Sequence, residues 1–143
     1  MSGTITRADR FTQTLKTPDL FSDFLNDFSA HPITGDIARI KNDQSIKQAL
    51  RNLVFTDLGE RLYQPTVGSN VRRSLFEFND SVTAADLQYH IKQTIENNEP
   101  RVSLLNVTVT SLPVQDKISI NIVFAIINTG TVQSLDLLLK RVR

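Results

Sequence analysis

The sequence contains no cysteine and only two histidines, His31 and His90, among its 143 residues. Without cysteine the chain cannot form disulfides, perform thiol chemistry or bind a metal through cysteine. Two histidines so far apart do not predict a zinc site. Glycine and proline number only five each, and most of them mark positions where the chain is expected to turn.

The chain also lacks an excess of charge and any long apolar run. Its formal net charge is +1, which gives no support for a nucleic-acid or membrane partner attracted by bulk charge. No apolar segment approaches the ~20 residues that span a bilayer, and the first residues do not resemble a signal peptide. We therefore expect a protein made and used in a cytoplasm, or assembled there into something larger, with no cofactor, metal or small-molecule substrate.

Two segments have helical periodicity. In 43–55 the apolar residues fall on one face, with Asn42 or Asp43 as candidate cap. Lys47, Gln48, Arg51 and Asn52 occupy the other face. In 83–97, Thr83 and Asp86 are placed as a capping box, with Val82 and Leu87 as a hydrophobic staple. The buried stripe of this second helix is predicted to be Ala84, Leu87, Ile91 and Ile95.

Alternating apolar residues predict three strands, at 102–112, 117–128 and 132–140. Leu105, Val107 and Val109 are expected to share one face of the first, and Leu135, Leu137 and Leu139 to point inward in the third. The second is apolar on both faces towards its end, which predicts a central strand covered on both sides there. The predicted fold is α+β, with two main helices packed on a small, mainly antiparallel sheet formed by a C-terminal β-meander.

Residues 1–40 differ from the rest, and we interpret residues 1–35 as an extended N-terminal arm that precedes an α+β domain at 36–143. Aromatic and apolar residues alternate with aspartates in 19–28. The alternative for that segment is a short amphipathic helix that closes the core. Between the two predicted helices, residues 60–80 carry turn-forming residues, one predicted helical turn around 71–76, and candidate core anchors at Leu75, Phe76 and Phe78.

Glu99-Pro100-Arg101 stands between the second helix and the first strand. Proline removes a backbone donor and disfavours helical angles at Glu99, so the chain must turn here. The turn is expected to expose one acid and one base on a stiff support. From the residues alone, two interpretations stay open: a docking corner for a partner, or a local pair that stabilises only this domain.

Other chemistries have little support in the sequence. A glycosidase needs two carboxylates about 5–9 Å apart, and Glu60, Glu77 and Glu99 are candidates without a supporting motif. His90 has no nucleophile-elbow glycines to complete a triad, and the Gly59 and Gly68 segments lack the spacing and lysine of a phosphate loop. The basic pairs at 72–73 and 140–141 are too few for nucleic-acid binding.

Five segments, taken together, resemble the small baseplate wedge protein of contractile phage tails, a family that includes a baseplate component of type VI secretion systems. They are Ile46-x-x-Ala49-Leu50-x-x-Leu53, Thr56-x-x-Gly59-Glu60-Arg61, Pro65-x-x-Gly68-Ser69, Leu75-Phe76-Glu77, and the second helix followed by Glu99-Pro100-Arg101-Val102. The resemblance covers roughly residues 36–128. Each motif is weak alone, but their order and spacing are fairly specific.

The resemblance implies a structural role and no catalytic residues. It implies that Glu99, Pro100 and Arg101 dock on a helix bundle of larger wedge proteins, and we add Glu60 and Arg61 to the candidate partner-binding residues. It also implies a sheet that serves as platform for the tail sheath protein, with 132–140 or the arm as its open edge; the tail tube or hub is a further candidate partner. The expected location is the virion tail, assembled in the host cytoplasm.

Two rivals remain beside a phage baseplate subunit: a muralytic, lysozyme-like hydrolase of the tail, and a type VI secretion subunit. For the docking corner, replacement of Arg101 by alanine is expected to leave the fold intact and abolish wedge assembly.

Overall fold

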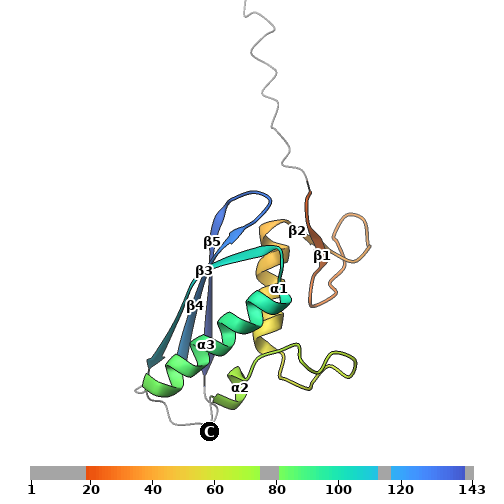
Figure 1. The fold of residues 1–143 in the computed structure, drawn as a ribbon. Coiled ribbons are helices and arrows are strands. Elements are labelled where there is room, and N and C mark those ends of the chain that lie inside the picture. The colour runs from red at the N-terminus through yellow and green to blue at the C-terminus, as the bar shows by residue number, and fades with distance from the viewer. Residues whose placement is uncertain (1–18, 75–80, 113–116, 141–143) are drawn as a thin grey trace, which may run out of the picture.

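The computed structural model describes residues 19–74, 81–112 and 117–140 (Figure 1). Its elements follow the order β1 (Ser22–Phe24), β2 (Arg39–Lys41), α1 (Asp43–Phe55), α2 (Val71–Ser74), α3 (Ser81–Asn98), β3 (Val102–Leu112), β4 (Lys117–Ile126) and β5 (Val132–Lys140). The predicted α+β class is confirmed, and so are both main helices and all three strands of the meander.

The main sheet is antiparallel in the order β3-β4-β5, so β4 is central as predicted. Helices α3 and α1 lie on one face of it, with α3 along β3 and α1 packed beside α3 (Figure 1). The core forms between these helices and the sheet. Its residues alternate along the strands and recur on one face of each helix. Its largest fully buried side chains are Phe124, Ile46, Leu50, Leu87, Ile91, Ile95, Ile120, Ile122 and Ile126.

The opposite face of the sheet differs from the prediction. Val123 and Ala125 of β4 are only half-buried there, and Ile127 just beyond the strand is 59% exposed. In the described residues no helix lies over this face (Figure 1). The predicted second cover is therefore wrong for the described part of the chain.

A β-bulge corrects the predicted register of β3. Leu104 pairs with Phe124 and Asn106 pairs with Val123, which leaves Leu105 as the extra residue. Leu105 is 56% exposed, while Leu104 packs on the core in its place. The simple alternation that placed Leu105 inward is wrong because the bulge shifts the period by one residue.

The N-terminal segment is extended, as one of the two interpretations predicted, and the helix at 19–28 is wrong. β1 pairs with β2 in a small two-stranded antiparallel sheet beside α1. Because β1 and β2 lie on opposite sides of residue 35, this pairing links the predicted arm to the predicted domain. The division at that residue stays a prediction, and residues 1–18 lie outside the described part.

The helix ends differ in detail from the sequence patterns. α3 begins at Ser81, so Thr83 lies within the helix and Val82 is 73% exposed, which excludes the predicted staple. Of its predicted stripe, Leu87, Ile91 and Ile95 are fully buried, whereas Ala84 is only half-buried. α2 gives the predicted helical turn. The proposed core anchors Leu75, Phe76 and Phe78 lie outside the described residues.

Candidate docking corner between α3 and β3

The turn between α3 and β3 is closed by backbone hydrogen bonds. The amide of Glu99 donates to the carbonyl of Ile95 (2.9 Å), and the amide of Val102 donates to the carbonyl of Glu99 (3.3 Å). Pro100 is exposed between these two residues. Because proline has no amide hydrogen, this position needs no hydrogen-bond acceptor. Ile127 also donates its amide to the carbonyl of Arg101 (3.1 Å), which attaches the corner to the end of β4. The corner is thus fixed from both sides.

Glu99 and Arg101 form a two-pronged ion pair within this turn. Arg101 Nε lies 2.6 Å from Glu99 Oε1, and Arg101 Nη2 lies 2.7 Å from Glu99 Oε2. Only 9% of the Glu99 side chain is exposed, against 34% for Arg101. The expectation that the turn exposes both charges is therefore wrong for the acid, because its carboxylate is turned inward to hold the guanidinium.

The guanidinium of Arg101 also lies over an aromatic ring from the N-terminal segment. Its Cζ is 5.5 Å from the ring centroid of Phe21, within the range of a cation–π contact. The hydrogen bond to Glu99 raises the pKa of Arg101 above its ordinary value; burial opposes this shift, and the negative charges of Glu99 and Asp23 add to it. Arg101 is accordingly a permanent, fixed cation at the corner.

Phe21 is held in place by Asn42, the residue before α1. The side-chain Oδ1 of Asn42 accepts from the backbone amides of Leu20 (2.9 Å) and Phe21 (3.4 Å). The backbone amide of Asn42 donates to the carbonyl of Phe21 (2.8 Å). Asn42 has a positive φ of 48°, and its side chain makes no capping bond to α1. The predicted cap at Asn42 is therefore correct in position, but its side chain binds the N-terminal segment.

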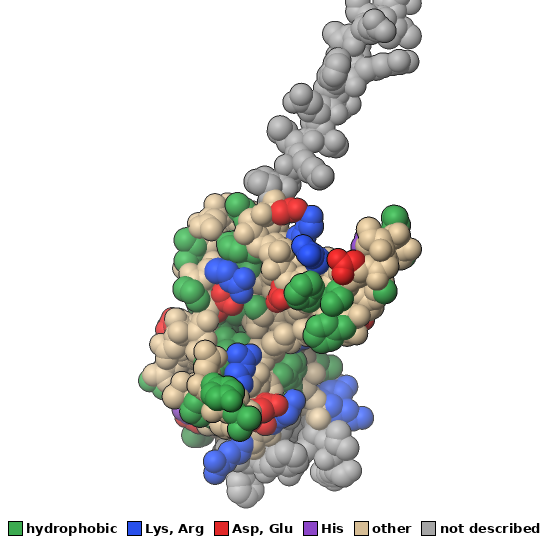
Figure 2. Space-filling view, turned by 90° about the vertical axis from the view of Figure 1, so that its right-hand side faces the viewer, with side chains coloured by type: hydrophobic (Ala, Val, Ile, Leu, Met, Phe, Trp, Pro, Cys, Tyr) green, Lys and Arg blue, Asp and Glu red, His purple; other side chains and the backbone are tan. Residues whose placement is uncertain are grey.

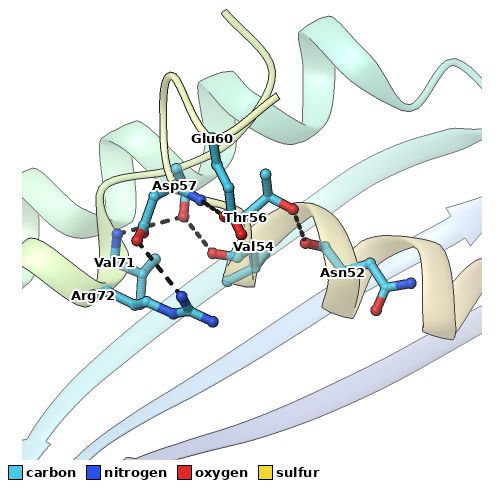
Figure 3. Close-up of polar contacts among 8 residues, drawn as sticks. Asn52, Val54, Thr56, Asp57, Glu60, Val71 and Arg72 are labelled. Atoms are coloured by element: carbon cyan, nitrogen blue, oxygen red, sulfur yellow. Dashed lines mark hydrogen bonds and ion pairs between the residues drawn. The ribbon is translucent and has the colours of Figure 1, made fainter. Parts of the chain in front are cut away.

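Glu60 and Arg61 lie outside this turn, in the loop 56–70 that follows α1. Glu60 Oε2 accepts from the amide of Asp57 (2.9 Å), and Asp57 also faces Arg72, with 3.7 Å between Oδ2 and Nη1 (Figure 3). Ser69 donates its hydroxyl hydrogen to the carbonyl of Val54. These contacts tie both ends of the loop to the end of α1, so Glu60 acts here as a turn-forming residue.

Arg61, unlike Glu60, lines a cavity that reaches the corner. The cavity has a volume of about 400 Å³ and also borders Glu99, Asp23 and Asn52. Arg61 is exposed and has no ion pair among the described residues. Of the five predicted binding residues, the structure therefore groups Glu99, Pro100 and Arg101 in one turn and places Arg61 beside it.

Sequence reasoning missed Phe21 and Asn42 as parts of this corner. The sequence places Phe21 only among the aromatic and apolar residues of 19–28, and Asn42 only as a candidate cap. No local pattern connects residue 21 with residue 101, because their contact depends on how the N-terminal segment returns to the end of α3. A positive φ at a non-glycine position is visible only in the structure.

The described residues contain no group of three or more metal-binding side chains. No described helix is long and apolar enough to cross a membrane. His90 is half-buried and lies 3.5 Å from Asp86 one turn earlier on α3, and exposed His31 accepts from the amides of Ile33 and Thr34 in a turn. Glu77 lies outside the described part.

Sequence comparison connects residues 41–131 with a known family, described as baseplate wedge protein gp25. The protein of that name from Enterobacteria phage T4 is 33% identical over 81 residues, which are 57% of this chain. The matched region spans 60% of that curated relative.

Solved structures share the fold. A Geobacter sulfurreducens protein provisionally named a tail lysozyme has a TM-score of 0.63 at 22% identity, covering 71% of this chain and 92% of its own. A chain of the baseplate of the anti-feeding prophage has a TM-score of 0.59 at 19% identity, covering 82% and 83%. A chain of the type VI secretion baseplate complex has a TM-score of 0.57 at 16% identity, covering 67% and 90%.

The matched region runs from the last residue of β2 to the residue before β5 and so includes both main helices, the loop after α1 and the Glu99–Arg101 corner. It makes up well over half of the sequence, and its family was already indicated by the order of the five motifs. The chain belongs to the baseplate wedge protein gp25 family.

Proposed function

We propose that the chain is a structural subunit of the baseplate wedge of a contractile phage tail. Membership of the family and the 33% identity to the phage T4 protein support this role. The observation that carries the proposal is the rigid corner, in which Arg101 is fixed by Glu99 yet keeps a third of its side chain exposed. A cation held in one geometry loses little entropy when a partner binds it.

The corner's partner is proposed to be a bundle of helices from larger wedge proteins. Two of the five guanidinium donors serve Glu99, which leaves donors for carbonyl or carboxylate oxygens of a partner. Arginines of this kind carry about 2 kcal/mol or more at interfaces. Arg61, on the cavity that Glu99 also lines, is proposed to extend the contact.

The tail sheath is proposed to contact the edge of the sheet at β5. This strand pairs with β4 over nine consecutive positions, and in the described sheet its other edge has no strand neighbour. An unpaired edge can accept a strand from another chain. The tail tube or hub is a further proposed neighbour, within a virion tail assembled in the host cytoplasm.

We propose that the chain is not an enzyme. The likeness to the protein named as a tail lysozyme rests on 22% identity and concerns the fold. Glu99 is engaged by Arg101 and Glu60 by the amide of Asp57, so each of these two carboxylates already has a structural partner. Clearing of cell walls by the purified protein, lost on substitution of Glu60 or Glu99, would support the hydrolase instead. The type VI likeness, at 16% identity, likewise concerns the fold.

The docking test needs a variant that removes the cation without stranding its partner. Glu99→Gln combined with Arg101→Met replaces the pair with neutral groups of similar size and avoids an unpaired buried carboxylate. We expect this variant to stay folded by circular dichroism and to fail in forming wedge complexes with the larger wedge proteins, measured by size-exclusion chromatography.

The matched control is Arg73→Met, which removes an exposed arginine of α2 and should assemble normally. Normal wedge assembly by the folded double variant would refute the docking role of the corner.

A further inference from the structure

A second hollow lies beside α1, between this helix and residues 22–41, the hairpin segment that carries β1 and β2. Its volume is about 400 Å³. Leu25, Ile40 and Leu135 contribute apolar surface to it, and Leu135 is 8% exposed while the other two are half-buried. Leu25 lies between β1 and β2, Ile40 lies in β2 and Leu135 lies in β5. We call this hollow the α1 groove.

One face of α1 forms the polar side of the α1 groove. Gln44, Lys47, Gln48 and Arg51 recur at intervals of three and four residues, so they project from the same side of the helix. Gln48 donates its Nε2 hydrogen to the carbonyl of Phe24 (2.7 Å) and thereby fixes the hairpin segment on the helix. The groove is thus a built feature, with its two walls joined by a hydrogen bond.

The two cations of the α1 groove have no carboxylate partner in an ion pair within residues 19–74, 81–112 and 117–140. Lys47 and Arg51 take part in no ion pair among the described residues, although they stand one helical turn apart, where like charges repel. Asp27 is the acid that lines the groove, and its Oδ1 accepts from the amide of Ser29 (3.2 Å). Asp43, at the start of the helix, is bound to Gln133 (2.9 Å).

Figure 2 shows hydrophobic and basic side chains next to one another over the segment that carries β1 and β2, which forms one wall of the α1 groove. An apolar floor beside two unpaired cations is complementary to a peptide that carries both apolar and acidic side chains. Nucleic acid is a poorer match, because two cations neutralise few phosphates and the floor offers no exposed aromatic ring for base stacking.

We propose that the α1 groove binds a short acidic segment of another protein. One or two apolar side chains of that segment contact Leu25, Ile40 and Leu135, and its carboxylates pair with Lys47 and Arg51. The groove and the Glu99–Arg101 corner are lined by different residues, so this chain would hold two partner segments independently.

The test uses the full-length protein labelled with nitrogen-15 and a blocked synthetic peptide with a repeating Leu-Asp-Glu sequence. Binding is followed by amide chemical shifts and by titration calorimetry. We expect shifts at Leu25, Ile40, Lys47 and Arg51, and affinity that weakens as salt is added. Lys47→Glu with Arg51→Glu should reduce affinity about tenfold or more, because two attractions become repulsions.

The control variant carries Arg73→Glu and Lys140→Glu, an equal charge change on exposed residues outside the groove, and should bind as the wild type does. A Leu-Lys-Arg peptide should bind the reversed variant better than the wild type. Equal affinity of wild type and reversed variant, or shifts centred on Arg101 instead, would overturn the proposal. Self-association through these residues in sedimentation experiments would also overturn it, since a second copy would then be the occupant.

Discussion

The Glu99–Arg101 pair joins a nearly buried carboxylate to a partly exposed guanidinium. Removal of Arg101 alone would leave the Glu99 charge in a buried site without its partner, which is far more costly than loss of a surface pair. The expectation that Arg101→Ala leaves the fold intact is therefore revised. We expect a loss of about 3 kcal/mol in unfolding free energy, at the lower end for a buried pair because the guanidinium is partly solvated.

Denaturant unfolding of Arg101→Ala and of the Glu99→Gln, Arg101→Met double variant tests this estimate. The double variant should be the more stable of the two, although it carries one more substitution. The opposite order would show that the carboxylate is tolerated in the site without its partner.

Phe21 should matter to the corner more than its place in the arm suggests. Phe21→Ala removes a half-buried ring and a cation–π contact, for an expected loss of about 1–2 kcal/mol in unfolding free energy. The chemical shift of the Arg101 Nε–H group should change as well, because the ring above it is gone.

Phe28→Ala is the control for that measurement, since Phe28 comes from the same segment and is 68% exposed. It should leave both stability and the Arg101 signal nearly unchanged. Equal effects of the two substitutions would contradict a specific role for Phe21.

At the scale of the element, the loop after α1 requires two stretches of backbone to lie close together. Gly68 has a φ of +141°, and a Cβ added there would lie 2.6 Å from the carbonyl oxygen of Thr56. Because the obstacle is backbone, it cannot rotate away. We expect Gly68→Ala to lower the unfolding free energy by about 2–4 kcal/mol, as measured by denaturant titration.

Gly59, in the same loop, supplies the comparison. Its φ is +86°, but an added Cβ would meet nothing within 4 Å. Gly59→Ala should therefore cost only the backbone strain, about 1–2 kcal/mol. If both substitutions cost the same, the contact at Thr56 does not limit the loop.

The elements were predictable to the extent that their signals are local. Periodicity gave α1 its observed bounds and placed α3 and the three strands of the meander within about two residues. It failed at Leu105, because a bulge breaks the alternation, and at Thr83, because a good capping residue also fits inside a helix. The β1–β2 pairing was not predictable, since a three-residue strand carries too little pattern to identify its partner.

The candidate site was predictable in part for a similar reason. The order of motifs along the chain pointed to Glu99, Pro100 and Arg101 as candidates. These residues are consecutive in sequence and therefore share one turn. The contact between Phe21 and Arg101 spans about eighty residues of sequence, and the burial of Glu99 is visible only in the structure. The α1 groove combines residues of three elements and has no local signature in the sequence.

The whole molecule is a two-layer structure with a smaller hairpin segment attached to it. Stability should be distributed accordingly, with the slowest amide exchange in β4 and in the buried stripe of α3. β1 and β2 should exchange fastest among the strands, because only three residues pair in each and most are exposed. Hydrogen exchange followed by mass spectrometry measures this order. Equal protection of β1 and β4 would mean that the hairpin segment unfolds only with the core.

The bulge at Leu105 makes the two edges of the main sheet unlike each other. Of the two outer strands of the main sheet, β3 has its ladder interrupted by the bulge, whereas β5 runs in uninterrupted register. A bulge twists a strand and makes it a poor template for another strand. If neighbours attach by adding strands, they should therefore add at β5 and not at β3. A subunit that can be extended on one edge only is suited to begin a stack of similar sheets and not to continue one in its interior.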